Sequence, residues 1–375
     1  MKILITGGHL SPALSVIEKL KGEEILYVGR KHALEGDKAF SLEYQTIKDL
    51  GIPFFSITTG RLQRKFTKHT IPSLLKFPLG FSQSLFILKR FKPDVVLGFG
   101  GYVSWPVIVM ASFLKIPIVI HEQTLEAGMT NKFAARFAAK ICISFESSKR
   151  FFPIKKVVLT GNPLRKEIVE ENQKSEIRNQ KSEGELPLLY VTGGSLGSHF
   201  INNLVKDTVR KLIRDFQVIH QTWDSNKYKD FDSLLKIKSE LGEYSERYTI
   251  NKFLTPLESA KTLKKADLVV SRAGINTVTE LLFLGKPSLL IPLPFTQNNE
   301  QLKNARFLKT QGLGEVLEQK KITAEVFLHT LEKMSKNIND YKKNSDQSKT
   351  LADKDAASRI VEVVKNVYKK KKNKK

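Results

Sequence analysis

Short, continuously apolar runs alternate with helix-length segments along most of the chain, and this alternation limits the fold more than any other feature. The runs lack the polar alternation of strands with one solvated face, so they are typical of parallel strands covered on both faces. They predict βαβ units and an α/β fold. The expected strands are Ile3–Thr6, Ile25–Val28, Val95–Leu97, Ile118–His121, Ile141–Ser144 and Val157–Thr160, then Leu188–Thr192, Val218–His220, Tyr248–Ile250, Leu268–Ser271, Ser288–Ile291 and Gly314–Leu317.

The chain has 375 residues, enough for two domains, and its strands form two sets that each suit one Rossmann-like domain. The polar stretch 170–187 separates them, and we interpret it as a solvated surface insertion. Ligands of such sheets bind at the carboxyl ends of strands, so we expect the two domains to face a shared cleft. We assign 1–163 to an N-terminal domain, 164–340 to a C-terminal domain, and 341–375 to a terminal helix that packs back on the N-terminal domain, plus a basic tail.

The charge of the chain predicts an anionic partner. Lys and Arg total 62 against 38 Asp and Glu, a formal net charge of +24. Nucleic acid, anionic lipid and a phosphorylated substrate are the candidate classes, and a solubility bias is the alternative. We find no aromatic–basic motif that would recognise nucleic acid. The charge therefore favours a phosphorylated substrate, an anionic membrane surface, or both.

The single cysteine, Cys142, excludes a disulfide framework within the chain, and no Cys/His cluster predicts a structural zinc site. We expect Cys142 to be a buried strand residue. No apolar run reaches the ~18 residues of a membrane span, and the start of the chain reads as a strand and turn rather than a secretory signal. We expect a cytosolic protein that touches a membrane from one side at most.

Four glycine-bearing turns follow expected strands. They span residues 6–13, 98–104, 192–198 and 273–277. Glycine permits positive φ and lets backbone N–H groups approach a phosphate closely. None of the four matches the dinucleotide pattern G-x-G-x-x-G or the P-loop pattern, which disfavours a nicotinamide dehydrogenase and a P-loop ATPase.

The segment Ser271–Glu280 carries the most specific chemistry. It begins at the end of an expected strand, turns at Gly274 and Asn276, and continues into an apolar helix. Free N–H groups and the helix dipole favour an anionic ligand at such a turn. Glu280, one helical turn later, is suited to accept hydrogen bonds from a sugar diol, although an ordinary surface acid is the alternative. The combination predicts a sugar nucleotide.

For three other features of the sequence, a functional interpretation competes with a structural one. The acidic run 230–232 raises the hypothesis of a metal site, but it lies in a lysine-rich helical stretch and we interpret it as solvated surface. Trp105 and Trp223 read as packing residues. Residues 71–88 are apolar, broken by Pro and Gly, and flanked by basic residues. They predict either a core helix with a basic loop or a membrane-surface patch, and both can hold.

Several ordered blocks together give a family resemblance from Met1 to about residue 340. They are Gly7-Gly8-His9 with Pro12-Ala13-Leu14, residues 98–104, His121-Glu122-Gln123, residues 128–131, residues 160–165, Gly193-Gly194-Ser195, His220-Gln221-Thr222, residues 272–280 and residues 301–305. The chain resembles the bacterial MurG family, the UDP-N-acetylglucosamine:lipid I transferases of peptidoglycan synthesis. The resemblance implies the GT-B glycosyltransferase architecture of two Rossmann-like domains facing a cleft, and a peripheral position on the cytoplasmic face of the cell membrane.

The resemblance also implies roles for single residues. A donor pocket for UDP-N-acetylglucosamine would comprise Arg165, Ser195, Leu254, Ile275, Asn276, Thr277, Glu280 and Gln301, with Asn202 and Arg272 in support. An acceptor site for lipid I would comprise Gly7, Gly8, His9, Tyr102, His121, Glu122 and Asn131. The first glycine loop is shorter than in the family, and Thr124 and Leu196 replace its usual Asn and Gln. The acceptor loops thus depart from the family's pattern more than the donor pocket does.

These residues predict an inverting transfer without metal or cofactor. His9 is the first candidate for the general base and Glu122 the second. The alternatives for these groups are structural: His9 would cap a helix, and His121 would be a neutral buried histidine. The alternative functions are a UDP-sugar epimerase of the same fold and a non-catalytic membrane scaffold that binds the UDP-sugar.

Overall fold

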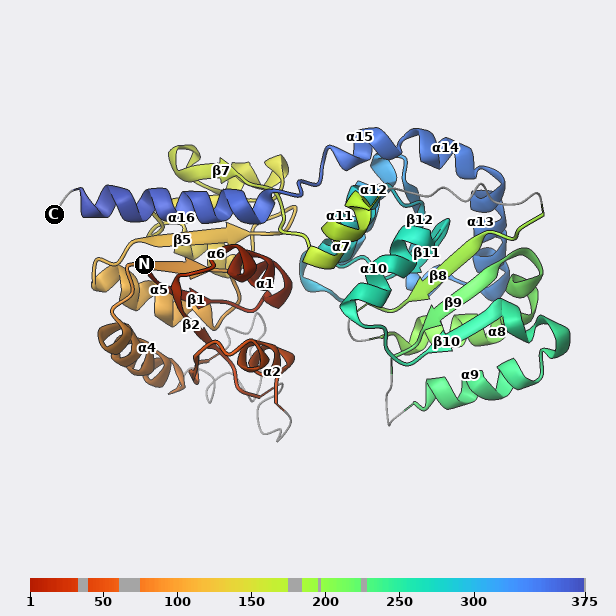
Figure 1. Cartoon of the computed structure of the whole chain (residues 1–375), viewed down its shortest axis with the longest axis horizontal. Helices are drawn as coiled ribbons and strands as arrows, with labels where there is room; N and C mark the ends of the chain where they lie inside the picture. Colours follow the sequence, from red (N-terminus) through yellow and green to blue (C-terminus); the bar gives the residue numbers. More distant parts are fainter. Residues whose placement is uncertain (33–39, 61–74, 175–183, 195–196, 224–227, 374–375) are drawn as a thin grey trace. The chain divides into compact units, whose positions relative to one another are not determined.

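The computed structural model describes residues 1–32, 40–60, 75–174, 184–194, 197–223 and 228–373. The chain divides into two compact units, each with its own sheet and helices (Figure 1). Unit 1 comprises Met1–Arg165 and Lys354–Lys375, and unit 2 comprises Lys166–Asp353. Residues 341–353, which we grouped with the terminal helix, therefore count with unit 2.

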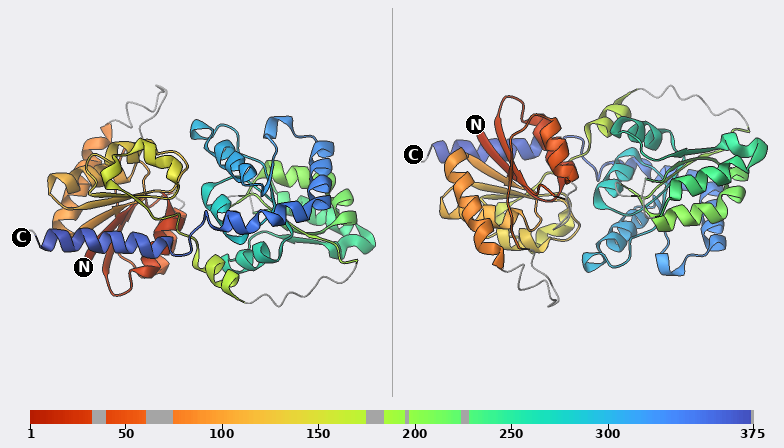
Figure 2. Two further views of the ribbon diagram at one scale, coloured as in Figure 1. Left: turned by 90° about the horizontal axis from the view of Figure 1, so that it is seen from above. Right: turned by 90° about the horizontal axis from the view of Figure 1, so that it is seen from below.

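Unit 1 is built on seven parallel strands in the order β3-β2-β1-β4-β5-β6-β7. Helices lie on both sides of the sheet (Figure 2). The strands are β1 Lys2–Thr6, β2 Glu24–Gly29, β3 Phe54–Ser56, β4 Val95–Gly98, β5 Ile118–Glu122, β6 Lys140–Ile143 and β7 Val157–Leu159. The α-helices are α1 Leu10–Lys19, α2 Leu42–Asp49, α4 Phe77–Phe91, α5 Ser104–Phe113, α6 Met129–Ala134 and α16 Ala356–Lys372.

Unit 2 is built on six parallel strands in the order β10-β9-β8-β11-β12-β13. The strands are β8 Leu188–Thr192, β9 Gln217–Gln221, β10 Tyr248–Asn251, β11 Leu268–Ser271, β12 Ser288–Leu290 and β13 Gly314–Val316. The α-helices are α7 Lys166–Gln173, α8 His199–Asp215, α9 Asp230–Ser239, α10 Pro256–Lys265, α11 Ile275–Leu284, α12 Glu300–Thr310, α13 Ala324–Lys336, α14 Ile338–Lys343 and α15 Ser345–Lys349.

The strands are apolar on both faces because each sheet is covered twice. In β1, Ile3 and Ile5 belong to one buried cluster and Leu4 to another, although the three residues are consecutive. Successive side chains of a strand point to opposite faces, so both faces of this sheet carry a core. This confirms the expectation of parallel strands, and Cys142 is fully buried in β6 as expected.

Helix α16 packs on unit 1. It contacts α1, and Ile360 and Val364 lie in the same buried cluster as Ile3 and Val16. The apolar residues of α16 recur at helical spacing and form one buried stripe, while lysines occupy its last turn. The terminal residues thus complete the unit in which the chain begins.

The expected strands all form, and one further strand does as well. Strand β3 has only three residues, follows Pro53, and lies at the edge of the sheet beside β2. Its residues are half-buried or exposed, so it lacks the apolar run that marks the other strands.

Both sheets reverse their strand order at one point, between β1 and β4 in unit 1 and between β8 and β11 in unit 2. On either side of such a switch point the crossover helices lie on opposite faces, which opens a crevice at the carboxyl ends of the two strands. The four glycine turns of the sequence follow these four strands. The fold thus places two turns at each switch point.

Candidate functional site

The two glycine turns of unit 1 pack backbone against backbone. Gly7 has φ 147°, and a Cβ there would lie 2.8 Å from the backbone of Phe99. The Gly8 N–H donates to the Gly100 carbonyl at 3.0 Å. Gly101 has φ 76°, and its Cβ would lie 3.0 Å from the Gly8 nitrogen. Side chains at these positions would force the turns after β1 and β4 apart, which explains the glycines.

His9 lies directly after the first of these two turns, at the N-cap position of α1. Its side chain makes no capping hydrogen bond, so the interpretation of His9 as a helix cap is wrong. His9 is half-buried by its exposed surface, and its removal from solvent lowers its pKa to about 4. The imidazole is therefore neutral near pH 7 and has a nitrogen lone pair to accept a proton.

His121, at the end of β5, is only 1% exposed. Its Nε2 lies 3.1 Å from the Ser144 hydroxyl and 3.4 Å from the Gly161 carbonyl. Burial lowers the pKa of His121 to about 3, and the nearby His9 lowers it further. These contacts describe a neutral histidine that joins the ends of β5 and β6, the structural alternative raised above.

Glu122 is buried, and both of its carboxylate oxygens are engaged. Oε1 accepts from the Thr124 N–H at 3.0 Å and the Thr124 hydroxyl at 2.7 Å. Oε2 accepts from the Gly128 N–H at 2.8 Å and from Asn131 Nδ2 at 3.0 Å. Burial raises the pKa of Glu122, and these hydrogen bonds oppose the rise. The carboxylate closes the loop 122–131, which favours a positioning role over that of a base.

Asn131 and Tyr102 complete this edge of unit 1. Asn131 is 3% exposed, and its Nδ2 also donates to the His121 carbonyl at 2.9 Å. Its Oδ1 is buried and has no hydrogen-bond partner in the part of the chain that the structure describes, a rare condition for a buried acceptor. Tyr102 is half-buried, with the Arg30 guanidinium 5.3 Å from its ring centre. The edge offers neutral polar groups around one imidazole.

The glycine turn after β8 leads into α8. A Cβ at Gly193 would lie 2.2 Å from the Ser198 nitrogen, and Gly194 and Gly197 have φ of 79° and 69°. Ser198 is the N-cap of α8, and its hydroxyl accepts from the Ile201 N–H at 3.3 Å. Ser195, a candidate donor ligand, lies outside the described residues.

Arg272, at the end of β11, ties three segments of unit 2 together. Its Nη2 donates to the Ser198 hydroxyl at 2.7 Å and its Nη1 to the Ile291 carbonyl at 3.1 Å. The side chain is 8% exposed, and burial lowers its pKa to about 10. Among the described residues its guanidinium bonds to this hydroxyl and this carbonyl, and no carboxylate pairs with it. A buried cation thus lies between the turns after β8 and β11, where it attracts anions.

Helix α12 bonds both the N–H and the carbonyl of Ala273 in the turn after β11. Gln301 Oε1 accepts from the Ala273 N–H at 3.3 Å and from the Leu293 N–H at 2.9 Å. Asn304, fully buried, donates from Nδ2 to the Ala273 carbonyl at 3.1 Å. From the sequence we assigned no role to Asn304, although its i+3 spacing from Gln301 places both residues on one face of a helix.

The N-terminus of α11 faces the same crevice. Gly274 is its N-cap and has no side chain, so the N-cap residue itself supplies no side-chain acceptor to the first N–H groups of the helix, which begins Ile275-Asn276-Thr277. Glu280, 7% exposed, lies one turn further along. Leu254 lies in the loop after β10. Arg165 is half-buried and is the last residue of the first segment of unit 1.

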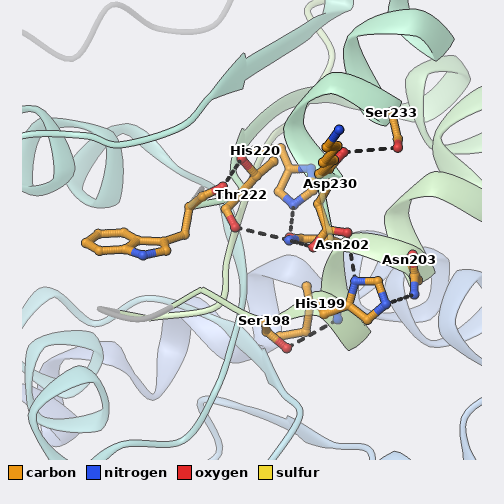
Figure 3. A network of polar contacts seen from close by, with 11 residues as sticks. Ser198, His199, Asn202, Asn203, His220, Thr222, Asp230 and Ser233 are labelled. Atoms are coloured by element: carbon orange, nitrogen blue, oxygen red, sulfur yellow. Dashed lines mark hydrogen bonds and ion pairs between the residues drawn. The ribbon is translucent and has the colours of Figure 1, made fainter. Parts of the chain in front are cut away.

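Asn202 belongs to a buried polar network in unit 2 (Figure 3). Its Nδ2 donates to the Thr222 carbonyl at 3.0 Å and to Asp230 Oδ2 at 2.7 Å. Its Oδ1 lies 3.1 Å from His220 Nε2, so His220 must donate there and accept from the Tyr248 hydroxyl at Nδ1, 2.9 Å away. Burial lowers the pKa of His220 to about 3, as this neutral tautomer requires.

The interpretation of residues 230–232 as solvated surface is wrong for Asp230. That residue is 8% exposed and accepts from Asn202 and from His199 Nδ1, the latter at 2.7 Å. Asp232 is exposed, as expected. Asp230 is the first residue of α9, and its polar partners come from α8, which sequence spacing does not reveal.

Among the described residues, no helix combines the length and apolarity needed to cross a bilayer. Residues 61–74, which include the first of the two basic flanks and the start of the apolar stretch of the expected membrane patch, lie outside the described residues. In α4, Leu79 and Phe86 are 47% and 54% exposed, and Leu75 just before the helix is 75% exposed. Ile87 and Leu88 are buried, so this helix has both a core face and an exposed apolar face.

Comparison with known proteins identifies the family. Residues 6–143 match the glycosyltransferase family 28 N-terminal domain, and residues 188–360 match the glycosyltransferase family 28 C-terminal domain. A relative from Bacillus cytotoxicus, a UDP-N-acetylglucosamine--N-acetylmuramyl-(pentapeptide) pyrophosphoryl-undecaprenol N-acetylglucosamine transferase, is 34% identical over 99% of this chain and 100% of its own length.

Solved structures agree with this match. The crystal structure of MurG from Acinetobacter baumannii is 25% identical, has a TM-score of 0.73, and is similar over 97% of this chain and 99% of its own. A UDP-GlcNAc 2-epimerase from Neisseria meningitidis is 16% identical with a TM-score of 0.62 over 96% and 99% of the two chains, and shares the fold alone. The chain therefore belongs to glycosyltransferase family 28 and, within it, to the MurG family of N-acetylglucosamine transferases, with the GT-B fold.

Proposed function

We propose that this protein transfers N-acetylglucosamine from UDP-N-acetylglucosamine to the C4 hydroxyl of lipid I, with inversion, and so forms lipid II in peptidoglycan synthesis. The relatives named for this transfer cover nearly the whole chain. One structural observation carries the donor half of the proposal: a buried guanidinium, with which no carboxylate of the described residues pairs, lies between two glycine turns at the switch point of unit 2. That arrangement suits a diphosphate.

The donor binds at this edge of unit 2. Backbone N–H groups at the starts of α8 and α11 meet the diphosphate, and Arg272 supplies positive charge from beneath. Glu280 accepts hydrogen bonds from the ribose hydroxyls, and Leu254 meets the uracil through its backbone. Gln301 contacts the ribose or sugar, and since its Oε1 is bound to Ala273 and Leu293, its Nε2 makes that contact. Arg165 and Ser195 also bind the donor nucleotide.

Departure of UDP builds negative charge on the diphosphate while the sugar becomes oxocarbenium-like. Preorganised donors stabilise such charge without rearranging during the reaction. The main-chain N–H groups and Arg272 therefore do what a metal ion does in other glycosyltransferases. This proposal expects full activity in excess EDTA, and a strict metal requirement would contradict it.

The acceptor binds at the glycine turns of unit 1, and His9 takes its proton. A base must be deprotonated and must have a free lone pair. His9 meets the first condition because its lowered pKa keeps the imidazole neutral at about pH 7, and it suits the second because the ring does not use a nitrogen for capping α1. Glu122 meets the second condition poorly, since each of its oxygens already accepts two hydrogen bonds. We assign Glu122 to holding the loop that carries Asn131.

The exposed apolar face of α4 is the proposed membrane contact, on the cytoplasmic side. Leu75, Leu79 and Phe86 follow helical spacing, and Lys89, Arg90 and Lys92 at the end of the helix are exposed toward anionic headgroups. Replacing Leu79 and Phe86 by Glu should abolish cosedimentation with vesicles that contain anionic lipid. Val326→Glu, at an exposed apolar position of α13 in unit 2, is the matched control. Unchanged cosedimentation of the double variant would exclude this face.

The decisive assay uses radiolabelled UDP-N-acetylglucosamine with a lipid I analogue, with and without chelator. Transfer of label to the lipid supports the proposal. Isomerised sugar with donor alone would indicate the epimerase hypothesis, which at present has only the shared fold in its favour. Donor binding without transfer would indicate the scaffold hypothesis.

A further inference from the structure

Trp223 has a backbone conformation that a large side chain seldom adopts. Its φ is 63°, in the left-handed region. Bulky residues are outliers there, and such strain persists only where the surrounding structure imposes it. Trp223 is the second residue after β9, at the carboxyl edge of the sheet of unit 2.

Three sets of contacts impose this conformation. The Thr222 hydroxyl donates to the Trp223 carbonyl at 2.8 Å, and the Thr222 N–H donates to the Asn251 carbonyl at 2.9 Å. Asn202 donates to the Thr222 carbonyl from the buried network of Figure 3. A Cβ on Gly197 would lie 2.4 Å from the Trp223 Cβ, so only a glycine leaves room for this residue beside the turn after β8.

The conformation keeps the indole at the edge and out of the core. Trp223 is half-buried, and it is absent from the buried apolar cluster of unit 2. The Phe253 ring, 55% exposed, meets it edge to face, with centroids 5.4 Å apart and planes at 71°. Phe253 directly precedes Leu254. One aromatic ring thus lies beside the glycine turn after β8, and the other lies in the loop after β10. Packing alone explains neither the strain nor the exposure.

We propose that Trp223, supported by Phe253, is the stacking surface for the uracil of the donor. This inference rests on the proposed function, because it takes the glycine turn beside Trp223 as the site of the diphosphate. A pyrimidine presents a flat π face that stacks on an indole. The edge-to-face contact with Phe253 fixes the plane of the indole, and the network through Asn202 fixes its backbone. The polar network then has a purpose in binding, since it orients a residue that touches the ligand.

The chain contains two tryptophans, which allows a direct optical test. Trp105 lies in unit 1, where its ring contacts Phe133 and Phe137, and it has no part in the proposed site. In a Trp105→Phe variant, Trp223 is the single tryptophan. Titration with UDP should quench its emission with the same Kd that calorimetry gives, and ribose 5-phosphate, which lacks the base, should not quench it.

The second arm changes the stacking surface itself. Trp223→Gly relaxes the backbone, because glycine adopts positive φ freely. It should raise the Kd for UDP about tenfold, the order of one lost base–aromatic stack, while the melting temperature stays equal or rises. Trp223→Phe should lose less affinity, and Trp105→Phe should lose none.

The outcomes separate the two proposals. Quenching by UDP together with a weaker Trp223→Gly variant supports the stacking surface. Heat of UDP binding with neither quenching nor a change of Kd in Trp223→Gly would overturn it and leave the proposed function intact. Absence of UDP binding to the unaltered protein would overturn both.

Discussion

The two switch points of this molecule share a backbone plan and differ in charge. Each follows the central strands of a parallel sheet, and each has two glycine turns. In unit 1 the side chains at this edge are His9, His121 and a fully hydrogen-bonded Glu122, and burial keeps both imidazoles neutral. In unit 2 the corresponding place holds the buried cation of Arg272.

The difference shows how one scaffold is adapted to two tasks. Backbone N–H groups at a switch point attract polar ligands in either unit. A neutral imidazole adds the ability to accept a proton, whereas a guanidinium adds a lasting positive charge that attracts an anion. From this difference we infer, as part of the proposed function, that unit 1 takes the proton and unit 2 holds the leaving diphosphate.

The largest expected effect tests the proton acceptor of unit 1. His9→Ala should lower kcat by about 10²–10⁴-fold, the usual contribution of a general base, and leave the Kd for UDP unchanged. Since burial lowers the pKa of His9 to about 4, kcat/KM of the unaltered enzyme should stay level from about pH 8 to 5 and fall only near pH 4. Initial rates with a lipid I analogue measure both. His329→Ala, at an exposed histidine of α13, is the control; equal rates for the two variants would end the assignment of His9.

The second effect tests the cation of unit 2. Arg272→Leu should lower kcat by about 10²–10³-fold, because the charge that develops on UDP loses one preorganised partner. Arg272→Lys should recover only part of the rate, since an ammonium group cannot span Ser198 and Ile291 as the guanidinium does. Arg210→Lys, at an exposed arginine of α8, serves as the matched control. A normal kcat for Arg272→Leu would remove Arg272 from the electrostatic scheme.

The third effect concerns binding in unit 2 alone. Glu280→Gln should raise KM for the donor about 10–100-fold, as expected when a charged hydrogen-bond acceptor is lost, with a smaller change in kcat. Removing the ribose 2′-hydroxyl from the donor should weaken its binding to the unaltered enzyme. The same change should weaken binding to Glu280→Gln only slightly further, since that variant has already lost the contact. Additive losses in this double-mutant cycle would show that the ribose contact lies elsewhere.

The smallest effect compares the stability of the two units. Burial lowers the pKa of His121 and of His220 to about 3 from 6.5, so below pH 6.5 the unfolded chain binds protons that the folded units do not. Each histidine should therefore lower the free energy of unfolding by about 1.4 kcal/mol per pH unit as the pH falls from 6.5 toward 3. Urea unfolding at about pH 7 and about pH 5.5, followed through Trp105 for unit 1 and Trp223 for unit 2 in single-tryptophan variants, measures this. The lowered pKa of His9 adds to the same loss in unit 1. A unit with the same stability at both pH values would contradict the neutral state of its histidines.

Much of the fold was predictable because parallel strands have a strong sequence signal. Twofold coverage requires apolar residues on both faces, and β1, β5 and β8 show this as continuous runs. Strand β3 escaped prediction because a three-residue edge strand after Pro53 needs no such run. The family and the positions of the glycine turns also followed from linear patterns.

The site was only partly predictable, since hydrogen-bond partners come from residues distant in sequence. Glu122 read as a candidate base, and only the loop that folds over it shows both of its oxygens in use. Asp230 read as a surface acid until α8 brought His199 and Asn202 against it. Trp223 read as a packing residue, because φ cannot be inferred for a tryptophan from its neighbours in the chain.

Sequence alone determined which segments become strands and helices, that the strands are parallel, and that glycines stand at the strand exits, since these depend on local apolar pattern and on steric limits of the backbone. The tertiary structure decided which polar groups are neutral, charged, engaged or exposed. Those properties depend on burial and on partners such as Arg272 with Ser198, which lie 74 positions apart and meet only when β8 and β11 pair.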